Sequence, residues 1–179
     1  MINNFNNQST ELSINCKAAL ELAEQDFSVF PVHWIMGNGK CSCGKKNCSS
    51  PGKHPLTGNG FKSATLDKTQ ILEWWAKWPD ANIGVATGEV SGVLVFDIDP
   101  RNGGDDTLKA LFEEFGEFPK TLKCETGGGG QHYYFEMPSL DPEVKLRGTL
   151  GKGIDVKHNG GYVIAPPSNH ISGGKYEWS

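Results

Sequence analysis

Apolar and polar positions follow helical and strand periodicities in turn along this chain. Apolar residues at helical spacing predict amphipathic helices over residues 14–25, 69–77 and 106–115. Runs rich in Val, Ile, Phe and Tyr predict strands over residues 27–35, 82–86, 93–98, 121–125 and 131–136. Pro31 places the first of these strands at the edge of a sheet, because proline has no N–H to donate. This interleaving predicts an α+β domain with a mixed, largely antiparallel sheet.

Two later segments have the pattern of a β-hairpin. Residues 154–157 and 162–165 are apolar strand-like runs, and His158-Asn159-Gly160-Gly161 lies between them. Asn-Gly pairs tolerate the positive φ angles of tight turns, so we expect the two runs to pair with each other. Residues 40–61, by contrast, contain too much Gly, Ser, Pro and Cys for regular structure, and we expect a long loop there.

The length of 179 residues suits one domain with its own hydrophobic core. We expect residues 1–13, which begin with an Asn-rich stretch, to form a flexible N-terminus and residues 14–179 to form the domain. No run of about 18 apolar residues exists, which excludes a membrane-spanning helix. The N-terminus has no apolar signal core either, so we expect a cytoplasmic protein.

The net charge of −4 argues at first against a nucleic-acid partner, but the charges are unevenly distributed. Two segments are locally basic, and either can be an ordinary solvated face or a phosphate-binding patch. The first lies between residues 37 and 66 and has no acidic residue; its lysines are Lys40, Lys45, Lys46, Lys53 and Lys62. The second has Asp155 as its one acid and contains Lys145, Arg147, Lys152 and Lys157.

A pair of carboxylates ends the most apolar strand. In Asp97-Ile98-Asp99-Pro100 the period of two puts both carboxylates on one face, with Phe96 and Ile98 on the other. Two like charges this close repel each other, and hard oxygen ligands at this spacing suit Mg²⁺ or Mn²⁺. A strand end with two solvated acids is the alternative, but the preceding apolar run favours the metal.

Two further segments contain candidate site residues. Residues 127–130 are four glycines, whose backbone N–H groups can approach an anion, and they lead into His132. His132 is either a phosphate contact or a structural histidine. In residues 153–157 a single carboxylate, Asp155, lies in an apolar strand and points the same way as Lys157. Asp155 is either a third metal ligand or a surface acid paired with Lys157.

A cysteine-rich loop, residues 37–62, has the composition of a metal site. Cys41, Cys43, Cys48 and His54 follow the pattern Cys-x-Cys-x4-Cys-x5-His. Three thiolates and one imidazole suit a closed tetrahedral structural zinc site. A disulfide is the alternative, but the cytoplasm disfavours it and it would leave an odd cysteine.

Taken in order, the motifs of this chain resemble the bifunctional DNA primase/polymerase domain of the archaeo-eukaryotic primase superfamily. The resemblance covers roughly residues 14–178, and it is specific because the motifs occur in the same order. The matching stretches are Gly52-Lys53-His54-Pro55, Gly60-Phe61-Lys62-x-Ala64-Thr65, Trp74-Trp75-x-x-Trp78-Pro79, Asn82-Ile83-Gly84-Val85-x-Thr87-Gly88, Ser91-Gly92 to Asp99-Pro100, Gly129-Gly130-Gln131-His132, and Gly153-Ile154-Asp155-Val156 through to Ala165-Pro166-Pro167-Ser168.

The resemblance implies a primase-polymerase palm, in which an RRM-like sheet joins a second small α/β unit and the active site lies between them. It implies that Asp97, Asp99 and Asp155 bind Mg²⁺ or Mn²⁺ and that His132 contacts the triphosphate of the incoming nucleotide. Gly130 stands where the Ser-x-His pattern of the family has serine, so this position supplies no hydroxyl. Relatives are often joined to a C-terminal helicase, and we expect this chain to be part of a phage or plasmid replication protein.

The function expected from these residues is template-dependent nucleotidyl transfer, by DNA primase or polymerase activity with two divalent ions, from dNTPs or NTPs. Gly129, Gly130 and His132 would hold the phosphates, and Lys157 would neutralise charge. The lysines expected to contact a DNA template or primer are Lys45, Lys46, Lys53 and Lys62. Two alternatives remain: a non-catalytic zinc-containing module for single-stranded nucleic acid, and a glycosyltransferase that uses Asp-x-Asp with Mn²⁺.

Overall fold

The computed structural model describes residues 11–141 and 143–179. Most of the N-terminal segment that was expected to be flexible, residues 1–10, lies outside this described part. The described helices are α1 (Ile14–Glu24), α2 (Lys68–Lys77) and α3 (Gly104–Phe115), with short 3₁₀ turns η1 (Gly60–Ser63) and η2 (Pro100–Asn102). None of the described helices has the length and apolar character needed to cross a membrane.

Local capping explains where the first two helices begin. The side chain of Ser13 accepts a hydrogen bond from the backbone N–H of Cys16 at the start of α1. Asp67 accepts one from Thr69 in the same way at the start of α2. α3 begins at Gly104, two residues earlier than the periodicity predicted. This position is glycine because a Cβ atom there would lie 2.5 Å from the carbonyl oxygen of Gly153.

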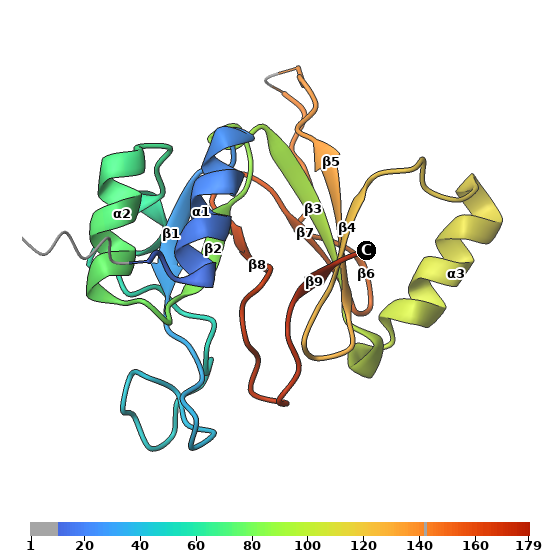
Figure 1. The fold of residues 1–179 in the computed structure, drawn as a ribbon. Helices are drawn as coiled ribbons and strands as arrows, with labels where there is room; N and C mark the ends of the chain where they lie inside the picture. The colour runs from blue at the N-terminus through green and yellow to red at the C-terminus, as the bar shows by residue number, and fades with distance from the viewer. Residues whose placement is uncertain (1–10, 142) are drawn as a thin grey trace, which may run out of the picture.

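The smaller sheet contains β1 (Val29–Val32), β2 (Asn82–Ala86) and β8 (Tyr162–Ala165), in the order β1-β2-β8. Pro31 lies in the edge strand β1, as predicted. α1 and α2 cover the outer face of this sheet (Figure 1). Their contact buries a hydrophobic core in which Ile71, Trp75, Phe30 and Ile83 are almost completely inaccessible.

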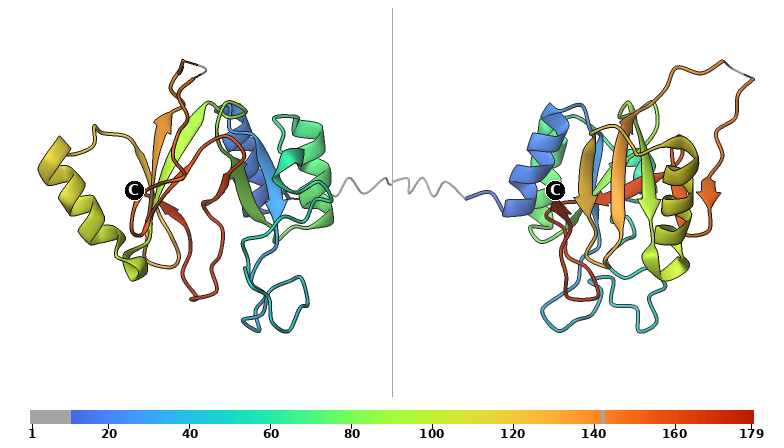
Figure 2. Two further views of the ribbon diagram at one scale, coloured as in Figure 1. Left: turned by 180° about the vertical axis from the view of Figure 1, so that it is seen from behind. Right: turned by 90° about the vertical axis from the view of Figure 1, so that its right-hand side faces the viewer.

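The larger sheet runs in the order β6-β7-β3-β5-β4-β9. Its strands are β3 (Val93–Ile98), β4 (Leu122–Glu125), β5 (Gln131–Glu136), β6 (Thr149–Gly151), β7 (Ile154–Lys157) and β9 (Glu177–Trp178). α3 lies on the outer face of this sheet (Figure 2). There Leu108 forms a small buried cluster with Ile98 and Ile154. The inner face, with Val95 and Tyr134, joins the core of the smaller sheet.

The α+β class with two joined units is confirmed, with one difference in the strand pairing. All described pairings are antiparallel, so the parallel component of a mixed sheet does not occur among them. The two sheets face each other between the outer helices, and one end of the space between them holds the charged residues described below. The very short strands β6 and β9 gave no periodic signal in the sequence.

The predicted hairpin over residues 154–165 is wrong. β7 pairs with β3 and β6 in the larger sheet, whereas β8 pairs with β2 in the smaller one. The connection between them is fixed by distant partners: Thr87 donates to the carbonyl of His158, and the side chain of Asn159 accepts from the N–H of Glu89. An Asn-Gly turn signal is local, so it cannot distinguish a hairpin from a link between two sheets.

Candidate active site

A cavity of about 620 Å³ lies between the inner faces of the two sheets. Both sheets contribute to its lining, and so do the cysteine-rich loop and the glycine turn after β4. Its charged and histidine side chains are Lys53, Asp97, Asp99, Arg101, His132, Asp155 and Lys157. All three carboxylates that the sequence singled out therefore line one cavity.

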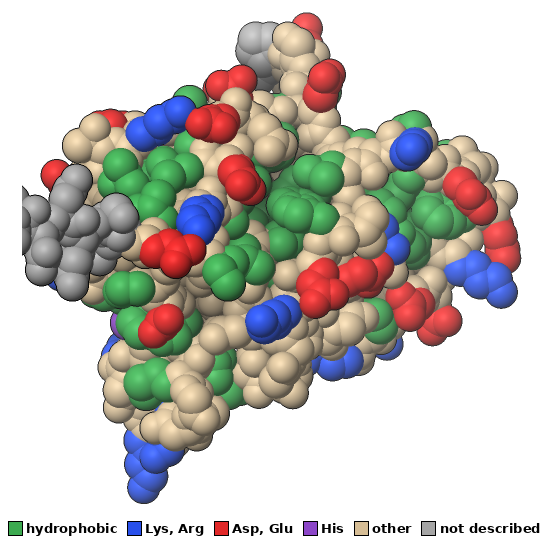
Figure 3. All heavy atoms as spheres, in the orientation of Figure 1, with side chains coloured by type: hydrophobic (Ala, Val, Ile, Leu, Met, Phe, Trp, Pro, Cys, Tyr) green, Lys and Arg blue, Asp and Glu red, His purple; other side chains and the backbone are tan. Residues whose placement is uncertain are grey.

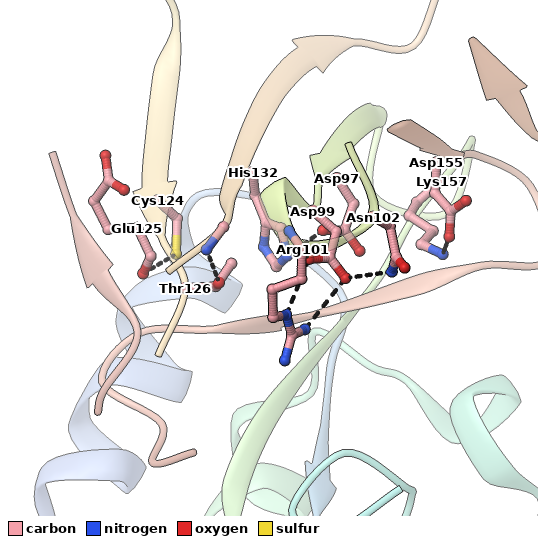
Figure 4. Close-up of polar contacts among 11 residues, drawn as sticks. Asp97, Asp99, Arg101, Asn102, Cys124, Glu125, Thr126, His132, Asp155 and Lys157 are labelled. Atoms are coloured by element: carbon pink, nitrogen blue, oxygen red, sulfur yellow. Dashed lines mark hydrogen bonds and ion pairs between the residues drawn. The ribbon is translucent and has the colours of Figure 1, made fainter. Parts of the chain in front are cut away.

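The strand register brings the three carboxylates to one end of the larger sheet. Asp97 in the central strand β3 lies directly opposite Asp155 on β7 and opposite His132 on β5. Directly opposite residues of an antiparallel pair have Cβ atoms about 4.5–5.5 Å apart. Asp99 continues the pairing beyond the end of β3, because its N–H donates to the carbonyl of Gly153 at 2.8 Å. Figure 4 shows these side chains on the same side of the sheet.

Asp97 is the most enclosed of the three acids. Burial alone would raise its pKa, but the contact with His132 and the charges of Lys157 and Lys53 outweigh burial, so the pKa lies below its usual value. The Nε2 atom of His132 lies 3.5 Å from Oδ1 of Asp97. Asp97 is therefore an ionised carboxylate at neutral pH, the form in which it can bind a cation.

Asp99 is held by two residues that the sequence reasoning missed. The guanidinium of Arg101 donates to its carboxylate at 3.1 and 3.2 Å, and the side-chain amide of Asn102 donates at 2.8 Å (Figure 4). The Arg101 hydrogen bonds are the largest influence on Asp99 and lower its pKa. Both residues follow Asp-x-Asp-Pro directly, so their position beside the pair was the one available signal.

Asp155 pairs with Lys157, with 2.7 Å between Oδ2 and Nζ, and its side chain is 58% exposed. The carboxylates of Asp99 and Asp155 thus each have a cationic partner within the cavity. In this arrangement the three acids do not form a tight ligand cluster; among the described residues only the cysteine and histidine group has all its ligand atoms within 4.8 Å of one another. Three ionisable oxygen donors around one cavity nevertheless fit the chemistry of Mg²⁺ or Mn²⁺.

His132 and the glycine turn lie on the other side of Asp97. The ring of His132 is 5% exposed, and its Nδ1 atom is buried without a hydrogen-bond partner among the described residues. Buried polar atoms without partners are rare in proteins, and a catalytic role or contact with a water molecule or ion can account for one. The turn itself is closed by Thr126, which bonds to the N–H groups of Gly129 and Gly130 through its carbonyl and hydroxyl oxygens.

The structure explains why position 130 is glycine. A Cβ atom at Gly130 would lie 2.4 Å from the carbonyl oxygen of Ile98, which is closer than any side chain can approach. The same Cβ would lie 3.2 Å from the hydroxyl oxygen of Thr126, which also lines the cavity. A threonine hydroxyl therefore occupies the neighbourhood that a serine at position 130 would otherwise fill.

Most of this chain also matches a known protein family. Residues 19–179 match the family described as bifunctional DNA primase/polymerase, N-terminal. The chain belongs to this family. Comparison with curated proteins gives no match. Family membership supports nucleotidyl transfer by a DNA primase or polymerase as the general function, with DNA and nucleotides as substrates.

The cysteine-rich loop of this primase/polymerase domain brings its four predicted ligands together. The Sγ atoms of Cys41 and Cys48 lie 3.6 and 3.4 Å from Nε2 of His54, and Cys43 completes the group. A tetrahedral zinc ion with ordinary bond lengths separates sulfur from nitrogen by about 3.6 Å. The ring of His33 packs 4.2 Å from that of His54, centre to centre. The loop thus contains a possible zinc site.

We expect one zinc ion per chain at this group, and Cys48→Ser should abolish its retention. The substitution removes a thiolate ligand, and three remaining ligands bind zinc far more weakly than four. Elemental analysis of the purified protein measures the zinc content. Cys16→Ala is the matched control, because Cys16 is buried in α1 outside the loop and should keep full zinc occupancy. Full retention of zinc by Cys48→Ser would contradict the assignment.

The structure separates the four lysines that were grouped by sequence. Lys45, Lys46 and Lys62 are exposed, and Figure 3 shows basic side chains at the outer end of the cysteine-rich loop. Lys53, by contrast, is partly buried and lines the cavity. Burial lowers its pKa, and the negative charge of Asp97 acts in the opposite direction.

Proposed function

We propose that this domain carries out template-directed nucleotidyl transfer with two Mg²⁺ or Mn²⁺ ions held by Asp97, Asp99 and Asp155. The observation that supports this most is the register of β3 and β7, which sets Asp97 opposite Asp155 at the end of the larger sheet. Bound there, the ions would stabilise charge on the triphosphate and lower the pKa of the attacking hydroxyl.

Other residues of the cavity bind the phosphates, face the primer and balance charge. His132 and the glycine turn, whose residues Gly128 and Gly130 line the cavity, hold the phosphates of the incoming dNTP or NTP on the side of Asp97 away from Asp155. The N–H groups of Gly129 and Gly130 bond to Thr126 and so shape this turn. Asp155 lies on the opposite side, where the 3′-hydroxyl of the primer, or of the first nucleotide in priming, would approach. Lys157 balances the charge of the carboxylates when the phosphates leave.

The biological setting is also part of this proposal. A replication protein of a phage or plasmid, in which a helicase domain accompanies the primase/polymerase domain, would supply the single-stranded template that such an active site needs. The template itself is DNA, and the exposed lysines of the cysteine-rich loop are the candidate contacts to its backbone.

Incorporation of labelled dNTPs and NTPs on a primed and an unprimed DNA template, with Mg²⁺ or Mn²⁺, tests this function directly. We expect template-dependent products that require the divalent ion. A glycosyltransferase acts on nucleotide sugars and would leave the labelled triphosphates unchanged, and a non-catalytic binding module would bind the DNA without extending it. Either of these outcomes would overturn the proposal.

We expect the exposed loop lysines to make DNA binding salt-dependent. Replacing Lys45 and Lys46 together by Glu should weaken binding and reduce the slope of log affinity against log salt by about 1.4 on single-stranded DNA, since each lost phosphate contact removes about 0.7. A salt titration of DNA affinity measures this slope. Lys109→Glu with Lys120→Glu is the matched control, because it changes the net charge equally outside the loop. An unchanged slope in the loop variant would place the template path elsewhere.

A further inference from the structure

Lys53 differs from the other cations that line the cavity. Arg101 forms an ion pair with Asp99, and Lys157 forms one with Asp155. Among the described residues the ammonium group of Lys53 has neither an ion-pair partner nor a hydrogen-bond acceptor, although it lies in the same cavity. A partly buried lysine without an acceptor is free to bind an anion without first breaking a bond.

The backbone of Lys53 is held tightly on both sides. Gly52 donates its N–H to the sulfur of Cys41 at 3.4 Å and accepts from the side-chain amide of Asn82 at 2.9 Å. On the other side, His54 is itself one of the four possible zinc ligands. Lys53 thus lies between Gly52, which bonds to a possible zinc ligand, and His54, which is one.

A third contact fixes Lys53 to the wall of the cavity. The hydroxyl of Tyr162, in β8 of the smaller sheet, donates to the carbonyl of Lys53 at 2.9 Å. The backbone of Lys53 therefore lies beside the smaller sheet and its residue lines the cavity, whereas Asp97 and Asp155 belong to strands of the larger sheet and Asp99 follows β3 directly. An anion bound against the carboxylate end of the larger sheet would have the ammonium group of Lys53 on its far side.

We propose that Lys53 binds the triphosphate of the incoming nucleotide, and that a zinc ion bound by the four cysteine and histidine ligands of the loop holds Lys53 in position. This inference rests on the function proposed above and assigns a role within that same site. Lys53 touches the substrate, whereas Cys41, Cys48 and His54 act through the backbone on either side of it. The cysteine-rich loop then has two functions: its exposed lysines face the template, and Lys53 faces the nucleotide.

Equilibrium binding separates this role from a template contact. Lys53→Ala should weaken binding of a non-hydrolysable dNTP, in Mg²⁺ without DNA, by about tenfold, because a charged hydrogen-bond donor is lost. Binding of the corresponding monophosphate and of single-stranded DNA should each stay within about twofold. Lys53→Arg should restore most of the affinity, and Lys120→Ala, which removes an exposed lysine outside the loop and the cavity, should leave it unchanged.

The positioning role of zinc is tested by combining two variants. Cys48→Ser should weaken triphosphate binding by about tenfold in the otherwise unchanged protein, but by less than about twofold in Lys53→Ala, since coupled residues give non-additive effects. If Cys48→Ser fails to fold, Tyr162→Phe takes its place, because it removes only the hydrogen bond to the Lys53 carbonyl and leaves the zinc ligands intact. A threefold loss of triphosphate affinity at unchanged zinc content would then support positioning.

The outcomes distinguish this inference from the function on which it rests. If Lys53→Ala weakens DNA binding and leaves triphosphate binding unchanged, Lys53 is a template contact and the inference is overturned while the polymerase proposal stands. Fully additive losses in the combined variant would refute the positioning role of zinc. Full affinity in Tyr162→Phe would refute the positioning of Lys53 through contacts to its backbone. If the unmodified protein binds triphosphate but forms no templated product, the proposed function fails on its own assay.

Discussion

Asp155→Asn should lower templated nucleotide incorporation by about a thousandfold or more while changing the free energy of unfolding very little. The side chain lies opposite Asp97 across the β3–β7 pair, so its loss leaves the divalent ions under-neutralised and misplaced. Its stability role is small, because it is 58% exposed and pairs with Lys157, and exposed ion pairs contribute about 0–1 kcal/mol. Incorporation in Mg²⁺ or Mn²⁺ and thermal melting without metal are the paired measurements.

Two further variants separate metal binding from the ion pair. Lys157→Met breaks the same ion pair but keeps the carboxylate of Asp155, so its loss of incorporation should be far smaller than that of Asp155→Asn. Asp106→Asn, on the exposed start of α3, controls for the change of charge and should be fully active. Equal losses in Asp155→Asn and Lys157→Met would make the ion pair the important feature. Near-normal incorporation by Asp155→Asn would remove the third ligand, and with it the two-metal mechanism.

His132→Ala should raise the KM for the incoming nucleotide by about ten- to a hundredfold. A charge-assisted hydrogen bond to phosphate contributes about 1.5–3 kcal/mol, and the substitution removes it. Because His132 is also buried against Asp97, we expect a lower melting temperature as well, and kinetics must be measured well below it. Steady-state incorporation at varied dNTP concentration gives KM and kcat separately.

His170→Ala is the matched control for the loss of stability. His170 is equally buried, at 5% exposure, but it bonds to Ser172 and does not line the cavity. We expect its variant to melt earlier and to keep the KM of the original protein. If the two histidine variants show the same melting temperature and the same unchanged KM, His132 has only a structural role.

The local elements could be predicted because their signals are local. Helical and alternating periodicities placed α1, α2, β2, β3 and β5 within a few residues of their observed bounds. Capping by Ser13 and Asp67 depends on residues two or three positions apart, so it too can be read from the sequence. The spacing of the four cysteine and histidine ligands is also a local signal, since one loop contains all four residues.

Some contacts of the candidate active site could not be predicted from local sequence patterns. Arg101 and Asn102 hold Asp99 through turn geometry that no periodicity describes. The role proposed for Lys53 depends on its direction: in sequence it is one of several loop lysines, and only the contacts of Gly52 and Tyr162 point it into the cavity.

By itself, the sequence determined which residues share a strand face: Asp97 with Asp99, and Asp155 with Lys157. That follows from the two-residue period of a strand, which no distant contact changes. The tertiary structure decided which strands are neighbours. It paired β7 with β3 and β8 with β2, against the local hairpin signal, because burying the inner faces of two sheets outweighs the preference of one turn. The same pairing set Asp155 opposite Asp97, so the candidate active site exists only in the folded chain.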